Sequence, residues 1–321
     1  MLPAALALIG ALIYGSADFL GGLAARRLRS IVVTAASALS GFLALALAQT
    51  LVGARWTAAD VAWGVAAGAV GVVAVALLYA CLAIGPMSIL SPLTAVVSAV
   101  APMTWGLVVE GDALAPVGYA GLAVALVAVV LVGFLPGEKV ARPSARGLAM
   151  AIGAGLAIGA FLIVLDQTSA ASGLVPLVIS RATSTALTAG ILGVLVVIAW
   201  TRGRRTRTVF EAGGAQLGAT PSGHADLEHA SRHPAPDGGV TVTWRRAWVL
   251  AIACGVVDAT ANALLLLALR SGDLAVVSAL TALYPAGTIL LAAFLLRERI
   301  APVQWIGLLL ALIAGGMLAA A

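Results

Sequence analysis

The chain of 321 residues is dominated by apolar side chains, with 62% hydrophobic and only 10% charged residues and a mean hydropathy of +1.11. Soluble domains carry about 25% charged residues, so this composition excludes an ordinary soluble protein. The net charge is +5, but the basic residues gather in a few loops. This placement indicates orientation in a membrane rather than binding of nucleic acid.

Apolar segments long enough to cross a membrane recur along the whole chain. A helix needs about 20 consecutive apolar residues to span the hydrocarbon layer. In chain order, helices are expected at 2–23, 31–53, 58–84, 87–109, 114–135, 147–167, 174–200, 247–269, 274–296 and 302–321. The first segment lacks the basic start of a signal peptide, so it is expected to be a retained helix. The sequence predicts an all-α integral membrane protein with ten transmembrane helices.

The basic residues lie almost entirely on one side of this arrangement. Loops after odd-numbered helices hold nearly all of them, whereas loops after even-numbered helices hold only Arg55 and Arg270. Lys and Arg near helix ends are retained in the cytoplasm. We therefore expect a multi-pass protein of the plasma membrane with cytoplasmic odd-numbered loops and external termini.

The long polar segment 201–243 is rich in Gly, Ala, Arg, Ser and Pro and has no apolar periodicity. We expect it to be disordered. Its histidines, His224, His229 and His233, lack the cysteine partners and fixed frame of a structural metal site. A solvated loop is favoured over a metal site, and no cofactor is expected.

The sequence contains an internal repeat. The segment ACLAIGPMSILSPLTA at 80–95 matches LALRSGDLAVVSALTA at 267–282, and LAPVGYAGL at 114–122 matches IAPVQWIGL at 300–308. Matches in the same order at nearly constant spacing indicate a duplication. We expect two five-helix halves, 1–135 and 147–321, joined by a cytoplasmic linker at 136–146. Five is an odd number, so the halves must lie in opposite orientations, as in many alternating-access transporters.

Two further stretches resemble a known family. With the repeat, ALTALYPAGTILLAAF at 279–294 and FLLRERIAPVQWIGLLLALIAGG at 294–316 resemble the drug/metabolite transporter superfamily, specifically its ten-helix EamA members. The resemblance implies a transporter of small molecules, which in this family include amino acids, drugs and nucleotide sugars. Family members are often drawn with cytoplasmic termini, whereas the basic residues here favour external ones.

Ionisable residues inside a membrane span are costly, so they are the default functional candidates. Asp258 lies in the middle of 247–269 with Asn262 one turn later, and Asp18 lies in the first helix with Tyr14 one turn earlier. Arg181 lies in the seventh helix, where Ser184, Thr185 and Thr188 continue its stripe. The functional interpretation makes Asp258 or Asp18 a proton-coupling group, with Arg181 as its partner or as the anchor of an anionic substrate group. The structural alternatives are an ion pair that stabilises the fold, or a charge that snorkels to the interface.

Small polar residues also recur at matching positions of the two halves. Ser91 and Thr94 in the first half correspond to Ser278 and Thr281 in the second. Such residues either line a cavity or hold membrane helices together. Tyr284, next to Pro285, adds shape to this region. The substrate-binding candidates are Arg181, Asn262, Tyr14, Tyr284, Ser91, Thr94, Ser278 and Thr281.

These features favour a secondary active transporter that moves a small metabolite or drug by alternating access, with proton-coupled efflux as one form. The expected partners are a small-molecule substrate and the lipid bilayer. An integral membrane enzyme is the main alternative, but it would need clustered acids, histidines or an activated nucleophile at the membrane face. A non-transporting sensor or scaffold would need an ordered soluble domain. The substrate, the coupling ion and the oligomeric state stay open at this point.

Overall fold

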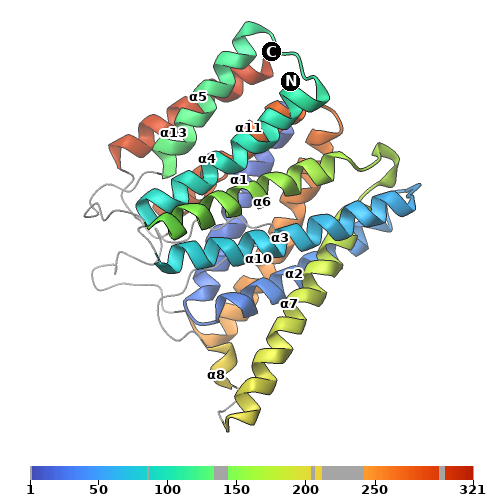
Figure 1. Cartoon of the computed structure of the whole chain (residues 1–321), viewed down its shortest axis with the longest axis vertical. Helices are drawn as coiled ribbons and strands as arrows, with labels where there is room; N and C mark the ends of the chain where they lie inside the picture. Colours follow the sequence, from blue (N-terminus) through green and yellow to red (C-terminus); the bar gives the residue numbers. More distant parts are fainter. Residues whose placement is uncertain are drawn as a thin grey trace.

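The computed structural model describes residues 2–84, 87–133, 144–203, 207–211, 242–295 and 301–320. Within these ranges the chain is all-α, apart from one isolated bridge between Leu28 and Glu211, as the sequence predicts (Figure 1). The elements are α1 (Leu2–Ala25), α2 (Ser30–Gln49), α3 (Ala58–Ile84), α4 (Met87–Trp105), η1 (Gly106–Glu110), α5 (Pro116–Gly133), α6 (Ala145–Asp166), η2 (Ala170–Ser172), α7 (Val175–Thr201), α8 (Arg207–Phe210), α10 (Trp244–Leu269), α11 (Leu274–Thr281), α12 (Pro285–Leu295) and α13 (Pro302–Ala319).

Several predictions fall on residues outside these ranges. The tight joint at 85–86, most of the linker 136–146, the three histidines of 201–243, and Arg297 and Arg299 lie outside the described residues.

The described chain contains nine helical segments that are long and apolar enough to cross a membrane. A further apolar helix, Pro116–Val132, is shorter. Together these occupy the positions of the ten predicted spans. The predicted all-α membrane fold is therefore confirmed.

The predicted helix at 274–296 is divided in two by a turn. Here α11 ends at Thr281 and α12 begins at Pro285, because proline has no backbone N–H to continue the hydrogen-bond ladder. The turn is closed by tighter bonds, from Leu283 N to Leu280 O at 3.1 Å and from Tyr284 N to Thr281 O at 3.1 Å. The span therefore consists of two shorter helices joined by a tight turn.

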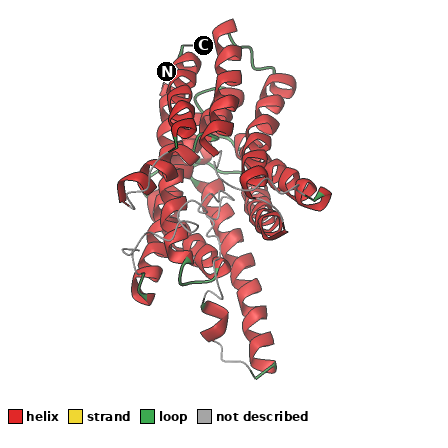
Figure 2. Cartoon of the chain, turned by 90° about the vertical axis from the view of Figure 1, so that its left-hand side faces the viewer, coloured by secondary structure: helices red, strands yellow, loops and turns green. Residues whose placement is uncertain are grey.

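The two termini lie side by side at one end of the bundle in both views (Figures 1 and 2). The connections after α2, η1, α6 and α10 meet at this end, which we call the terminal end. Leu174 N donates to Gln49 Oε1 at 2.6 Å, and Gln167 Nε2 donates to Glu110 Oε1 at 3.0 Å. At the opposite, basic end, Arg29 N donates to Phe210 O at 3.0 Å. The helices therefore alternate in direction.

Helices from the two halves of the chain pack against each other in a reciprocal pattern. α1 packs on α10 as α6 packs on α3, and α2 packs on α10 as α7 packs on α3. α5 pairs with α13, and both helices begin at the proline of the repeated Ala-Pro-Val sequence. Proline suits the first position of a helix, because its fixed φ fits and its missing N–H is not needed there.

Two glycines allow the closest of these crossings. A Cβ at Gly68 would stand 2.5 Å from Ser180 O and 2.7 Å from Thr183 Cβ, where α3 crosses α7. A Cβ at Gly255 would clash with Ser37 O, where α10 crosses α2. Gly68 and Gly255 are separated by the same number of residues as the repeated segments 80–95 and 267–282. At both crossings backbone meets backbone, as small residues permit in membrane helices.

We expect Gly68→Ala and Gly255→Ala to destabilise the protein, because the added methyl group meets backbone that has no room to move. A cost of about 1–3 kcal/mol each is typical of such overpacking. Thermal unfolding of the purified protein in detergent measures the effect. Gly193→Ala is the matched control, since a Cβ there has nothing within 4 Å and alanine favours the helix. Equal melting temperatures for all three variants would contradict the packing argument.

Candidate substrate and coupling site

The structure places a buried ion pair in the middle of the membrane region. Arg181 on α7 and Asp258 on α10 are 1% and 0% exposed, and Arg181 Nη2 lies 2.5 Å from Asp258 Oδ2. Asn262 Nδ2 donates to Asp258 Oδ2 at 3.2 Å and to the Asp258 carbonyl at 2.8 Å. The pairing of Asn262 with Asp258 follows from their spacing of one helical turn.

Two predicted residues of α1 lie against this pair. Tyr14 and Asp18 are both fully buried, and α1 packs along α10. Tyr14 lies within electrostatic range of Asp258, Arg181 and Asp18. We call Tyr14, Asp18, Arg181, Asp258 and Asn262 the central cluster.

The sequence missed two neighbours of the central cluster. Cys254 is fully buried. It also lies within electrostatic range of Asp258, Asp18 and Arg181 and within hydrogen-bonding distance of Ser37. Ser37 on α2 donates to Ala251 O at 2.8 Å. Helical spacing alone places Cys254 on the face of Asp258, one turn earlier, whereas nothing in the sequence marks Ser37 on α2.

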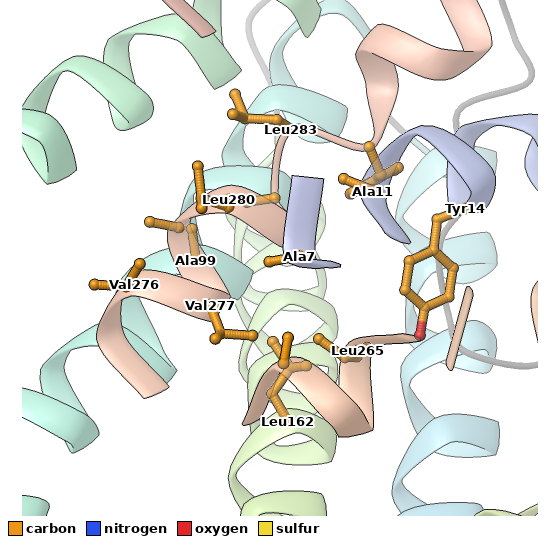
Figure 3. Close-up of a cluster of buried hydrophobic side chains, with 14 of the residues drawn as sticks. Ala7, Ala11, Tyr14, Ala99, Leu162, Leu265, Val276, Val277, Leu280 and Leu283 are labelled. Carbon is orange, nitrogen blue, oxygen red and sulfur yellow. The ribbon is translucent and has the colours of Figure 1, made fainter. Parts of the chain in front are cut away.

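A block of apolar side chains fills the bundle next to the central cluster, toward the terminal end (Figure 3). It joins α1, α4, α6, α10 and α11 with further members from α2, α3, α5, α7 and α13, and it includes Tyr14. Its labelled members are Ala7, Ala11, Ala99, Leu162, Leu265, Val276, Val277, Leu280 and Leu283. Dense apolar packing excludes water, so the block closes this side of the cluster.

On the other side of the cluster, toward the basic end, a cavity of about 100 Å³ lies between α2, α3 and α7. It is lined by Ile31, Thr34, Val72, Val75, Ala76, Ser184, Thr188 and Ile191. Ser184 and Thr188 belong to the stripe predicted to continue from Arg181, and both are buried. Thr185, of the same stripe, donates to Arg181 O at 2.7 Å.

The remaining polar candidates form bonds away from the central cluster. Thr94 donates to Leu90 O and Ala151 O, Ser278 to Ala275 O, and Thr281 to Val277 O. All three residues are buried, and their bonds to backbone carbonyls fit a role in helix packing. Tyr284 is buried in the turn before α12. The side chain of Ser91 lies outside the described residues.

The terminal end is held by polar bonds that the sequence did not predict. Ser169 N donates to Asp60 Oδ1 at 2.8 Å, and Arg270 Nη2 donates to Ser172 Oγ at 3.0 Å. Burial lowers the pKa of Arg270, and the charge of Asp60 opposes that shift. Burial, together with the charge of Asp112, raises the pKa of Asp273. These contacts close the bundle at this end.

Within the described ranges, no three His, Cys, Asp or Glu side chains gather in a way that could hold a metal ion. The fold and the buried charges define a polytopic membrane protein with a polar centre. Residues 238–319 match the model of the EamA-like transporter family, which confirms the resemblance predicted from the sequence. The family match indicates a membrane transporter of the drug/metabolite type, and this family consists of transporters rather than enzymes.

Solved structures share the fold. One protein of known crystal structure aligns with this chain at a TM-score of 0.66 and 16% sequence identity. The alignment covers 98% of this chain and 95% of the other chain. At this level of identity the likeness shows the fold alone. No curated protein matches the chain.

The charge balance of the central cluster predicts unequal effects of its two partners. Arg181→Met leaves the carboxyl of Asp258 without its guanidinium, in a cluster that also holds Asp18, and should cost about 3–5 kcal/mol, as stranded buried charges do. Asp258→Asn leaves one carboxyl facing one guanidinium, so it should change stability much less. The double variant Arg181→Met with Asp258→Asn should recover most of the loss.

Thermal unfolding in detergent distinguishes these variants. If both single variants were equally unstable, Arg181 and Asp258 would form an isolated structural pair, and Asp18 would have no share in their charge balance.

Proposed function

We propose that this protein is a proton-coupled secondary transporter that exports a small metabolite or drug across the plasma membrane by alternating access. The observation that carries the proposal is the buried pair of Arg181 and Asp258 with Asp18 and Tyr14 beside it. Ionisable groups inside a membrane span mark substrate and proton pathways. The EamA match of 238–319 supports the transporter class.

Protons provide the coupling because the central cluster holds more acids than bases. Arg181 pairs with Asp258, Tyr14 and Cys254 lie within electrostatic range of Asp258, and Asp18 lies within range of Tyr14 and Cys254. The cluster holds two carboxyls and one guanidinium, so uptake of one proton makes it neutral. Neutral groups are cheaper to bury in a low dielectric. Binding and release of that proton therefore change the free-energy cost of moving the cluster between an aqueous and an apolar environment.

Alternating access arises from two halves of opposite orientation, 1–135 and 147–321. The reciprocal packing of α1 on α10 and α6 on α3 supports this duplication, as do the matching crossings at Gly68 and Gly255. If each helix is replaced by its counterpart in the other half, the same set of helix contacts results. Inverted repeats transport by rocking one half against the other around a site near the midplane.

The two ends of the bundle differ in a way that fits export. The terminal end is closed by apolar packing and by bonds such as those of Asp60 and Gln49. The cavity beside Arg181 lies toward the basic end. If the basic loops are cytoplasmic, this arrangement suits a protein that takes its substrate from the cytoplasm.

We expect Asp258→Asn to abolish accumulation driven by a pH gradient while the protein still reaches the membrane. Proteoliposomes with an imposed gradient, screened with amino acids, sugars and cationic drugs, first identify a compound that the wild type accumulates. The same compound then tests the variant. Glu211→Gln, a carboxyl at the basic end, is the control and should keep accumulation. Full pH-driven accumulation by Asp258→Asn would reject this residue as the coupling group and move the proposal to Asp18.

Orientation has its own test. With cytoplasmic odd-numbered loops and an even number of spans, a reporter that is active only in the cytoplasm should be silent when fused after Ala321. The same reporter inserted next to Arg202 should be active. Strong signal from the fusion at Ala321 would overturn the orientation and, with it, the argument for export.

A further inference from the structure

We infer that Arg270 is a gate residue, which fastens the end of α10 to the turn η2 and thereby keeps the terminal end closed. We call the contact of Arg270 with Ser169 and Ser172 the strap. This inference rests on the alternating access of the proposed function, and it names the contact that has to be released before the terminal end opens. It follows from the place of Arg270 in the sequence, from its bonding partners and from the helices that it joins.

Arg270 stands where the charge pattern of the chain disfavours a base. Only Arg55 and Arg270 lie in loops after even-numbered helices, although basic residues collect on the other side. A base that directly follows a helix commonly bonds the last carbonyls of that helix. Arg270 directly follows α10, but its Nη2 donates to Ser172 Oγ at 3.0 Å and to Ser169 O at 3.3 Å. The guanidinium therefore binds the connection between α6 and α7 instead of its own helix.

The strap can both hold and release, because the oxygens that accept from Arg270 are uncharged. A guanidinium bonds a carboxylate more strongly than a hydroxyl or carbonyl oxygen, and Arg181 has such a carboxylate in Asp258. The Nε of Arg270 is buried and has no acceptor among the described residues, so the closed contact satisfies the guanidinium only in part. Water that enters as the end opens can satisfy all of its N–H groups. The contact is therefore favourable but reversible.

Asp60 fixes the turn that receives Arg270. This carboxylate on α3 is 2% exposed, and Ser169 N and Oγ donate to it at 2.8 and 3.2 Å. Thr57 N and Oγ1, directly before α3, each donate to it at 2.8 Å. The charge of Asp60 also attracts the guanidinium of Arg270. A carboxylate that accepts four hydrogen bonds is held firmly, so Arg270 binds a turn that is fixed to α3.

The strap joins elements that otherwise have little contact. Helix α10 is not among the helices closely packed on α7, and it touches α6 only slightly. In the middle of the bundle, α10 and α7 meet through the ion pair of Arg181 and Asp258. Arg270 lies roughly 18 Å further along α10, at a rise of about 1.5 Å per residue, and η2 leads directly into α7. A second contact of a guanidinium therefore holds α10 beside the start of α7 at the terminal end.

The repeated sequence carries the strap in one half only. In the match of 80–95 with 267–282, Arg270 corresponds to Ala83, and an alanine side chain has no hydrogen-bond donor. Inverted repeats with identical contacts at both ends would favour neither closed state. Because Arg270 adds a contact at the terminal end alone, it shifts the equilibrium toward the state in which this end is closed.

The test measures how often the terminal end opens. Val277 on α11 is 0% exposed and belongs to the apolar block on this side of the central cluster (Figure 3). Cysteine is a small hydrophobe that suits the place of valine. A charged maleimide reacts with Val277→Cys when water reaches the thiol, and it is applied to the full chain in lipid nanodiscs. Each variant without the added cysteine gives the background from Cys81 and Cys254.

Arg270→Met should raise the labelling rate of Val277→Cys at least about tenfold, as the loss of hydrogen bonds from a charged donor predicts. Ser172→Ala removes one of the two acceptors and should raise the rate less. Combined with Arg270→Met it should add little, because both variants remove the same contact. Arg55→Met is the matched control, since Arg55 is an exposed arginine of the same end. It should leave the rate within about twofold.

A second reporter distinguishes opening of the terminal end from loss of the fold. Val33 on α2 is also 0% exposed, and it belongs to an apolar cluster at the basic end. Arg270→Met should leave the labelling rate of Val33→Cys within about twofold. A protein that had partly unfolded would be labelled faster at both positions.

Two results would overturn the inference. Arg270→Met could label Val277→Cys no faster than Arg55→Met does, or it could speed labelling of Val277→Cys and Val33→Cys to the same degree. Labelling needs neither substrate nor gradient, so its failure is separate from failure of the proposed function. Unchanged labelling with intact pH-driven accumulation rejects the strap alone. Faster labelling of Val277→Cys alone, in a protein whose wild type accumulates no compound, supports the strap and rejects the proposed coupling.

Discussion

A charge in the hydrocarbon layer has to be neutralised at short range, and the ion pair of Arg181 and Asp258 meets this constraint. The two residues lie on α7 and α10, which are not among the closely packed helix pairs of the described chain. Between them, α2 contacts both helices, and α1 and α3 each cover one of them. The long arginine side chain joins two helices of the second half, with α2 of the first half packed against both. Three helices of the first half, α1, α2 and α3, therefore pack around this one electrostatic contact.

The packing around this contact relies on residues without bulk. Gly68 and Gly255 bring α3 onto α7 and α10 onto α2 at backbone distance. Ser184 and Ser37 then bond to carbonyls of the facing helices. Bilayer lipid is as apolar as leucine, so close packing and such bonds replace the hydrophobic effect as the force between membrane helices. Small residues therefore allow the close helix packing around the ion pair of Arg181 and Asp258.

The sequence predicted the spans well because the hydrocarbon layer imposes a length on each helix. It also identified Asp258, Asp18, Arg181 and Tyr14 as candidates, since ionisable groups in a span are rare. It could not show that they share one site, because they come from three helices whose neighbours are decided by packing. The pairing of Asn262 with Asp258 was predictable, as both lie on one helix. The sequence predicted one continuous helix over 274–296, whereas the turn of Leu283 and Tyr284 before Pro285 divides it.

Other parts of the fold and the site could not be predicted from the sequence, for a different reason. Cys254 and Ser37 have the composition of ordinary filling residues, and only their contacts reveal their place. The bonds at the terminal end involve backbone groups of Ser169 and Leu174, which the side-chain sequence does not reveal. The lining of the cavity combines residues of three helices, with five apolar positions that resemble any lipid-facing surface.

The two glycine crossings have a mechanical consequence. Where backbone lies against backbone, only small side chains such as Ser184 and Ser37 bond across the contact, so the contact opposes separation of the helices more than it opposes a change of their angle. Each crossing joins one helix from either half, α3 to α7 and α10 to α2. In the proposed transport cycle, the line through these two crossings is the axis about which one half would tilt against the other.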